Sequence, residues 1–147
     1  MKIIVVQTTQ SPDLVQNKLN IKFPELKEFL FCTNSFELTL KEIRPNQKSF
    51  VITGNFLKTE TRGLQRNADA LLKEIKKINQ GAKVILYSSD PFASNPSGFD
   101  AIYKKEGAGD YECNGYIEIF YKEGIVKTPE IPKISWYQSF LSRVLGQ

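Results

Sequence analysis

Three short runs of apolar, mostly β-branched residues do most to limit how this chain can fold. Residues 2–6 read KIIVV, residues 49–53 read SFVIT and residues 83–89 read KVILYSS. Apolar runs that are continuous rather than alternating indicate strands buried on both faces, as in parallel sheets covered by helices. Each run stops at polar residues, and parallel strands place such ends together at one edge of the sheet.

A helix is predicted after the first strand. Ser11 suits the N-cap and Pro12 suits the first helical position. Pro24 limits its length, because proline interrupts a helix interior. The predicted apolar face consists of Leu14, Val15 and Leu19.

The next two elements are a strand and a short helix. Residues 28–33 have strand composition, although a helical interpretation of residues 25–31 competes. Ser35 is the predicted cap of the following helix, since a serine side chain can accept a bond from the first helical turn. Its predicted apolar side consists of Phe36, Leu40 and Ile43.

The clearest helical pattern lies in residues 64–79, where the apolar residues recur on one face. Those residues are Leu64, Ala68, Leu71, Leu72, Ile75 and Ile78. Lys76 and Lys77 near its end complement the helix dipole. Residues 99–105 are predicted to form one more strand.

This alternation predicts an α/β fold: a three-layer, doubly wound, five-stranded parallel sheet with a C-terminal extension. We expect an α/β domain over residues 1–123, in which the aromatic stretch 111–121 fits a helix or a strand. Residues 124–147 are interpreted as a Pro-containing linker and an amphipathic helix with Trp136 and Phe140 on its apolar side. That helix either folds back on the domain or engages a partner, a second copy or a membrane surface. The membrane is the least favoured of these, because residues from 134 onward include one Arg and no Lys.

Composition excludes several kinds of chemistry. The chain has no histidine, which rules out Ser-His-Asp and Cys-His catalysis, a histidine phosphorelay residue and histidine metal ligands. Cys32 and Cys113 are isolated, so we expect two buried free thiols, with a disulfide as the less favoured alternative. We therefore expect no metal and no cofactor. The chain shows no secretory signal and no apolar run of membrane-spanning length, which predicts a cytoplasmic protein.

Polar residues at the strand ends occur in a recognisable order. They are Gln7 and Thr8, Asn55, Ser88 followed by Ser89, and Lys105, with Lys104 as an alternative to Lys105. Over residues 1–110 this layout resembles the receiver domain of two-component response regulators. In that family an acid pair holding a divalent cation, a phosphoacceptor Asp, a Thr or Ser, and a Lys end the first, third, fourth and fifth strands. A Gly follows the phosphoacceptor by eight residues, as Gly63 follows Asn55 here.

The carboxylates that this family uses are missing at the matching positions. A neutral amide such as Asn55 cannot form an acyl phosphate, and Mg²⁺ prefers carboxylate oxygens to those of Gln7 and Thr8. The resemblance therefore implies a degenerate receiver without phosphorylation or bound Mg²⁺, which is not an enzyme. Each residue also has a structural interpretation: Asn55 caps its strand, the serines bond backbone groups, and Lys105 is solvated or pairs with Asp90 or Glu106.

The favoured function is a protein-protein interaction module in signalling or assembly, binding a partner protein or a second copy. Candidate partner-binding residues are Tyr87, Tyr103, Trp136 and Phe140. One alternative is a flavodoxin-like binder of phosphate or a nucleotide, or an enzyme built on that sheet. Another is weak nucleic-acid binding, suggested by a net charge of +4 and a basic excess in residues 58–77. We favour a solvated helix face for that excess, so nucleic acid is an improbable partner.

Overall fold

The structure is a computed structural model that describes residues 1–90, 98–107 and 109–128. The chain divides into two compact units, Met1–Ile117 and Glu118–Gln147, and the first of them contains the sheet. Trp136 and Phe140 lie outside the described residues. Within the described part, no helix has the length and apolar character needed to cross a membrane.

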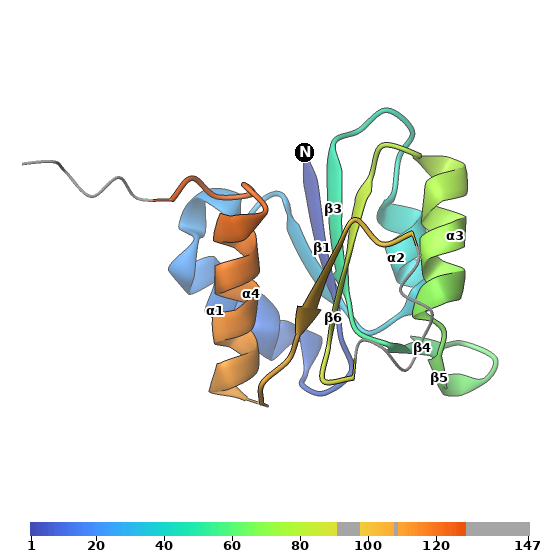
Figure 1. Ribbon diagram of the computed structural model, residues 1–147, viewed down its shortest axis with the longest axis horizontal. Helices are drawn as coiled ribbons and strands as arrows, with labels where there is room; N and C mark the ends of the chain where they lie inside the picture. The colour runs from blue at the N-terminus through green and yellow to red at the C-terminus, as the bar shows by residue number, and fades with distance from the viewer. Residues whose placement is uncertain (91–97, 108, 129–147) are drawn as a thin grey trace, which may run out of the picture. The chain divides into compact units, whose positions relative to one another are not determined.

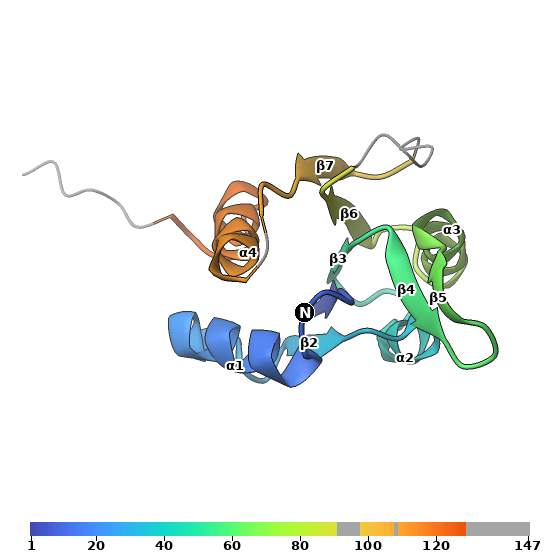
Figure 2. The same cartoon turned by 90° about the horizontal axis from the view of Figure 1, so that it is seen from below.

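The main sheet of the first unit is parallel, with the strand order β2-β1-β3-β6-β7 (Figures 1 and 2). Its strands are β1 (Lys2–Val6), β2 (Leu30–Thr33), β3 (Ser49–Thr53), β6 (Lys83–Ser88) and β7 (Ala101–Lys104). Counted along the chain, this is the doubly wound order that flavodoxin and receiver domains share. The predicted fold class is therefore confirmed.

Helices cover both faces of this sheet. They are α1 (Pro12–Lys22), the short 3₁₀ helix η1 (Pro24–Leu26), α2 (Phe36–Glu42), α3 (Ala68–Ile78) and α4 (Asp110–Lys122). Helices α2 and α3 lie on one face, with α1 and the beginning of α4 on the other (Figure 2). The aromatic stretch 111–121 is thus helical. The competing interpretation of residues 25–31 gives way to η1 followed by β2.

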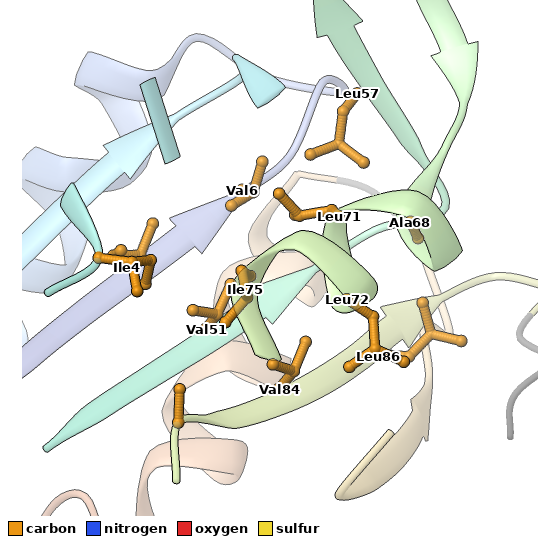
Figure 3. Close-up of a cluster of buried hydrophobic side chains, with 12 residues drawn as sticks. Ile4, Val6, Val51, Leu57, Ala68, Leu71, Leu72, Ile75, Val84 and Leu86 are labelled. Carbon is orange, nitrogen blue, oxygen red and sulfur yellow. The ribbon is translucent and has the colours of Figure 1, made fainter. Parts of the chain in front are cut away.

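The core explains why the strand sequences are continuously apolar. Figure 3 shows side chains of β1, β3 and β6 packed against Leu71 and Ile75 of α3. Strand β1 is buried on both faces. Ile4 and Val6 belong to this cluster, and Ile3 and Val5, which point to the other face, are equally inaccessible to solvent. An alternating sequence would have placed polar groups under one layer of helices.

A β-hairpin not predicted from the sequence separates β3 from α3. It consists of the antiparallel strands β4 (Phe56–Thr59) and β5 (Gly63–Arg66), so the helix predicted over residues 64–79 begins only at Ala68. Gly63 has a φ of 67°, a backbone conformation that favours glycine, and it returns the chain into β5. Leu64 belongs to β5 and is 58% exposed, so its predicted place on the helix face is wrong.

The first two helices follow their predicted signals in most respects. Ser35 accepts a hydrogen bond from the backbone N–H of Leu38 at 3.1 Å, as a serine N-cap should. Pro12 opens α1, but Ser11 makes no side-chain capping bond. Leu14 is exposed, whereas Val15 and Leu19 are buried. The apolar face of α1 is therefore narrower than predicted.

A side chain of α1 blocks the outer edge of β2. The Gln16 amide donates to the carbonyl oxygen of Leu30 at 3.0 Å and accepts from the N–H of Cys32 at 2.9 Å. One side chain thus pairs with the edge as a neighbouring strand would, which discourages strand addition there.

The cysteines match the prediction. Cys32 and Cys113 are buried free thiols. Burial, and secondarily the nearby Cys113, raises the pKa of Cys32 to about 12. Cys32 therefore remains an unreactive thiol at neutral pH.

Candidate functional site

A pocket at the carboxyl ends of the strands brings together all five predicted site residues. Gln7, Thr8, Asn55, Ser88 and Lys105 line it, because β1, β3, β6 and β7 all end at this edge. Further lining groups include Thr9, Arg66, Ser89 and Asp90. Its volume is about 200 Å³, below the roughly 300–1,000 Å³ of pockets for drug-sized ligands. The pocket is a small hollow, and most of the residues that line it have polar side chains.

Asn55 directs its side chain to neighbouring protein groups. Its Nδ2 donates to Ser88 Oγ and to the backbone oxygen of Asp90, both at 2.8 Å. An amide NH₂ has two hydrogens, so these two bonds use its full donor capacity. The backbone carbonyl oxygen of Asn55 also accepts from the backbone N–H groups of Asn67 and Ala68, where α3 begins. Asn55 therefore ties the end of β3 to the ends of β6 and of the hairpin.

Gln7 organises the loop after β1. Its Nε2 donates to the carbonyl of Gln10, and its Oε1 accepts from the Gln10 N–H, both at 2.8 Å. The hydroxyl of Thr9 lies 3.2 Å from the same oxygen. Thr8 makes only a long contact of 3.4 Å with the Phe56 carbonyl. The amide of Gln7 thus shapes the loop from within.

Lys105, rather than Lys104, points inward. Its Nζ lies 2.7 Å from Oε1 of Glu112, and its side chain is 10% exposed. Neither predicted alternative, a solvated lysine or a pair with Asp90 or Glu106, describes this residue. Lys104 is exposed on β7.

Glu112 is the central residue of this region that the strand-end pattern did not predict. Its carboxylate is fully buried and accepts from the Thr9 hydroxyl, whose oxygen lies 2.6 and 2.8 Å from the two carboxylate oxygens. It also accepts from Gln10 Nε2 at 2.9 Å and from the Tyr116 hydroxyl at 3.2 Å. Burial raises the pKa of Glu112, but the bonds from Lys105, Thr9 and Gln10 outweigh burial and hold it below its ordinary value. The carboxylate is therefore ionised at neutral pH.

A sequence signal for Glu112 existed. Glu112 lies one helical turn before Tyr116 and next to Cys113, and both of these side chains are buried. An acid therefore occupies the side of α4 that faces the domain. A charge on such a face needs a partner. That partner, Lys105, is on a different element, and the pairing follows only from the three-dimensional structure.

Tyr87 lies beneath this ion pair and is not part of the surface. Its ring meets Tyr116 edge-on with centroids 5.0 Å apart, and its hydroxyl donates to the backbone oxygen of Glu112 at 3.2 Å. A Cβ at Gly115 would come within 1.9 Å of that hydroxyl, so only glycine fits there. Tyr87 is 3% exposed, so its side chain offers little surface, and its role in binding a partner stays a prediction. Tyr103 is half-buried on the edge strand β7.

Metal ligands are not gathered in the part of the chain that the structure describes. No group of three or more His, Cys, Asp or Glu residues there could hold a metal ion. Asp90 is the one carboxylate that lines the pocket among the described residues. One carboxylate beside amides and hydroxyls is a poor donor set for Mg²⁺.

Comparisons with known proteins do not assign this chain to a family. No family model matches the chain, and no curated protein matches it. Among solved structures it is similar to RcsB from Salmonella enterica serovar Typhimurium, bound to promoter rprA in the presence of the phosphomimetic BeF3-. The sequences are 14% identical, the match covers 99% of this chain and 91% of that one, and the TM-score is 0.48. The fold assignment rests on the strand order itself.

Proposed function

We propose that this protein is a receiver-like module without phosphorylation chemistry, which acts by binding another protein. One observation carries the proposal: Gln7, Asn55 and Lys105, three of the predicted site residues, are already bonded to other groups of this chain. Asn55 uses its donors on Ser88 and Asp90, and Lys105 is paired with Glu112. Groups committed in this way hold the fold together instead of waiting for a substrate.

The residue types support the same conclusion. Accepting a phosphoryl group at the end of β3 requires a carboxylate nucleophile, and Asn55 supplies an amide. Asp90 is exposed in the loop after β6, where its backbone groups bond Asn55 and Ser88. Among the described residues, its carboxylate belongs to no group of three or more His, Cys, Asp or Glu side chains that could hold a metal ion.

The pair between Lys105 and Glu112 opposes anion binding as well. A lysine stabilises a phosphoryl group through its positive charge, and here an ionised carboxylate at 2.7 Å already neutralises that charge. A phosphate entering the pocket would meet the repulsion of the Glu112 charge.

Thermal melting with Mg²⁺ and beryllofluoride tests the absence of phosphorylation chemistry. We expect neither addition to raise the melting temperature of the protein, because no carboxylate cluster gains a counterion. The variant Gln7→Asp/Thr8→Asp/Asn55→Asp restores the acids and should gain stability from Mg²⁺, with Asn55→Asp alone as the milder version. A clear shift of the unmodified protein with either addition would overturn the proposal.

The interaction role needs its own test. Tagged full-length protein purified from its native source should bring a stoichiometric partner, identified by mass spectrometry. Light scattering of the purified chain distinguishes a second copy from a different protein. Recovery of a monomer without a partner, at near-native concentration, would contradict an assembly role.

A further inference from the structure

We infer that the outer face of the β4–β5 hairpin docks an acidic, amphipathic segment of a protein partner. This inference deepens the proposed function and rests on it. The hairpin face, as we call it, consists of Phe56, Lys58, Leu64 and Arg66. It borders the strand-end pocket, which Phe56 and Arg66 also line.

Strand register places these side chains together. Phe56 lies directly opposite Arg66, and Lys58 lies opposite Leu64. Alternate residues of a strand share one face, so these four side chains project from the same side of the hairpin. Phe56 is 41% exposed and Leu64 is 58% exposed. Two large apolar side chains are therefore exposed at diagonal positions of the hairpin, each opposite a cation.

The opposite side of the hairpin is firmly attached to the domain. Leu57 is fully buried in the core beside α3 (Figure 3), and its N–H donates to Oδ1 of Asn67 at 3.1 Å. The N–H of Lys58 donates to the carbonyl of Asn34 at 2.8 Å, and Lys58 forms a parallel bridge with Ser35. The hairpin face is thus a preformed surface, which lowers the entropic cost of binding.

Charge indicates the kind of partner. Lys58 and Arg66 carry two positive charges on this face, and the exposed turn residues Glu60 and Arg62 carry one charge of each sign. Apolar groups framed by cations complement a segment in which apolar residues alternate with Asp and Glu. Such a combination gives both burial of apolar area and charge pairing.

The same residues fit nucleic acid less well. The guanidinium carbon of Arg66 lies 5.0 Å from the centre of the Phe56 ring, so a cation already covers a face of the one aromatic ring in this set. Leu64 has no π face on which a base could stack. The observations therefore favour a peptide over a single-stranded nucleic acid.

Titration of the full chain with defined probes tests the inference, with backbone amide NMR shifts as the readout. The first probe is a short synthetic peptide in which Asp and Glu alternate with Phe and Leu. In the second peptide Ser replaces the apolar residues, and in the third Lys replaces the acids. Oligo-dT is the nucleic-acid probe. We expect the first peptide to shift amides of residues 56–66 and the other three probes to bind more weakly.

A pair of matched variants identifies the surface. Phe56→Ser/Leu64→Ser should weaken binding of the first peptide by about tenfold or more, the loss typical of a central apolar contact. Leu14→Ser/Ile21→Ser removes two exposed apolar side chains of α1, where Ile21 is 82% exposed, and should leave that affinity unchanged.

Three results would overturn the inference: no binding of the first peptide, equal loss of affinity in both variants, or tighter binding of oligo-dT at the same amides. None of these results depends on Mg²⁺ or beryllofluoride. A melting shift with those ions would instead overturn the proposed absence of phosphorylation chemistry. The two failures are therefore distinguishable.

Discussion

The strand-end pocket and the hairpin face lie next to each other but differ in how their polar groups are used. In the pocket, buried amides, hydroxyls and a lysine bond to other groups of the same chain. On the hairpin face, cations and large apolar side chains point into solvent. The polar groups of the pocket therefore stabilise the fold through their internal partners. The hairpin face is anchored from behind but leaves its side chains exposed, so they can contact a second molecule.

The largest expected effect concerns the buried ion pair. Glu112→Gln leaves Lys105 charged and without its carboxylate, so the free energy of unfolding should fall by about 3–5 kcal/mol. Urea unfolding measures this loss. The control is Glu118→Gln, which breaks an exposed pair with Lys122 on the same helix and should cost less than about 1 kcal/mol.

The double variant Glu112→Gln/Lys105→Met tests whether the cost comes from the orphaned charge. Removing both charges should recover much of the stability lost by Glu112→Gln, because the uncompensated ammonium is gone. If Glu112→Gln lowers the free energy of unfolding no more than Glu118→Gln does, the pair between Lys105 and Glu112 does not stabilise the pocket. The contrast drawn between the pocket and the hairpin face would then be wrong.

The amide of Asn55 should have the next largest effect. Asn55→Ala removes two buried hydrogen bonds and should lower the free energy of unfolding by about 2 kcal/mol. Ser88→Ala removes only one partner of that amide and should cost less. Both variants remove the bond between Asn55 and Ser88. The double variant Asn55→Ala/Ser88→Ala should therefore lose less stability than the sum of the two single variants. Fully additive costs would show that the two side chains act independently.

Acid should weaken the pocket through Glu112. Its pKa in the folded protein lies below the ordinary value of 4.5, so its stabilisation is present above that pH. The stabilisation is lost as pH falls from 4.5 through the lowered pKa, with a slope of up to about 1.4 kcal/mol per pH unit. Urea unfolding at several pH values should show a shallower dependence in Glu112→Gln. Parallel profiles for the two proteins would refute this assignment.

The hairpin face should have the smallest effect on stability. Phe56→Ser/Leu64→Ser replaces exposed side chains and should change the free energy of unfolding by less than about 0.5 kcal/mol per residue. Leu57→Ala, on the buried face of the same strand, should cost about 2–5 kcal/mol. Thermal melting and urea unfolding compare the two. A large loss in the serine variant would mean that these residues support the fold.

The sequence was informative where one local pattern decides the structure. Burial on both faces of a parallel sheet requires continuous apolar runs, so β1, β3 and β6 were identifiable from residues 2–6, 49–53 and 83–89. The polar strand ends could also be located, because parallel strands end at one edge. Asn55 and Ser88 consequently lie together as expected.

Features that depend on contacts between distant segments were not predictable. Leu64 extends the helical spacing of α3 by chance, and the positive φ of Gly63, which starts β5, leaves no trace in that spacing. Glu112 is visible as an acid on an apolar helix side, but its pairing with Lys105 depends on how α4 meets the sheet. The burial of Tyr87 likewise depends on the packing of Tyr116.

Exposure of the chain to acetyl phosphate and Mg²⁺, followed by measurement of its intact mass, tests whether the strand-end pocket can accept a phosphoryl group. The pocket offers an amide where a phosphoacceptor would stand, and its lysine is held by Glu112. We predict that the mass of the protein stays unchanged, while Asn55→Asp with Gln7→Asp and Thr8→Asp gains a phosphoryl group. A phosphoryl adduct on the unmodified protein, mapped to Asp90 or any other pocket residue, would contradict the proposed absence of phosphorylation chemistry.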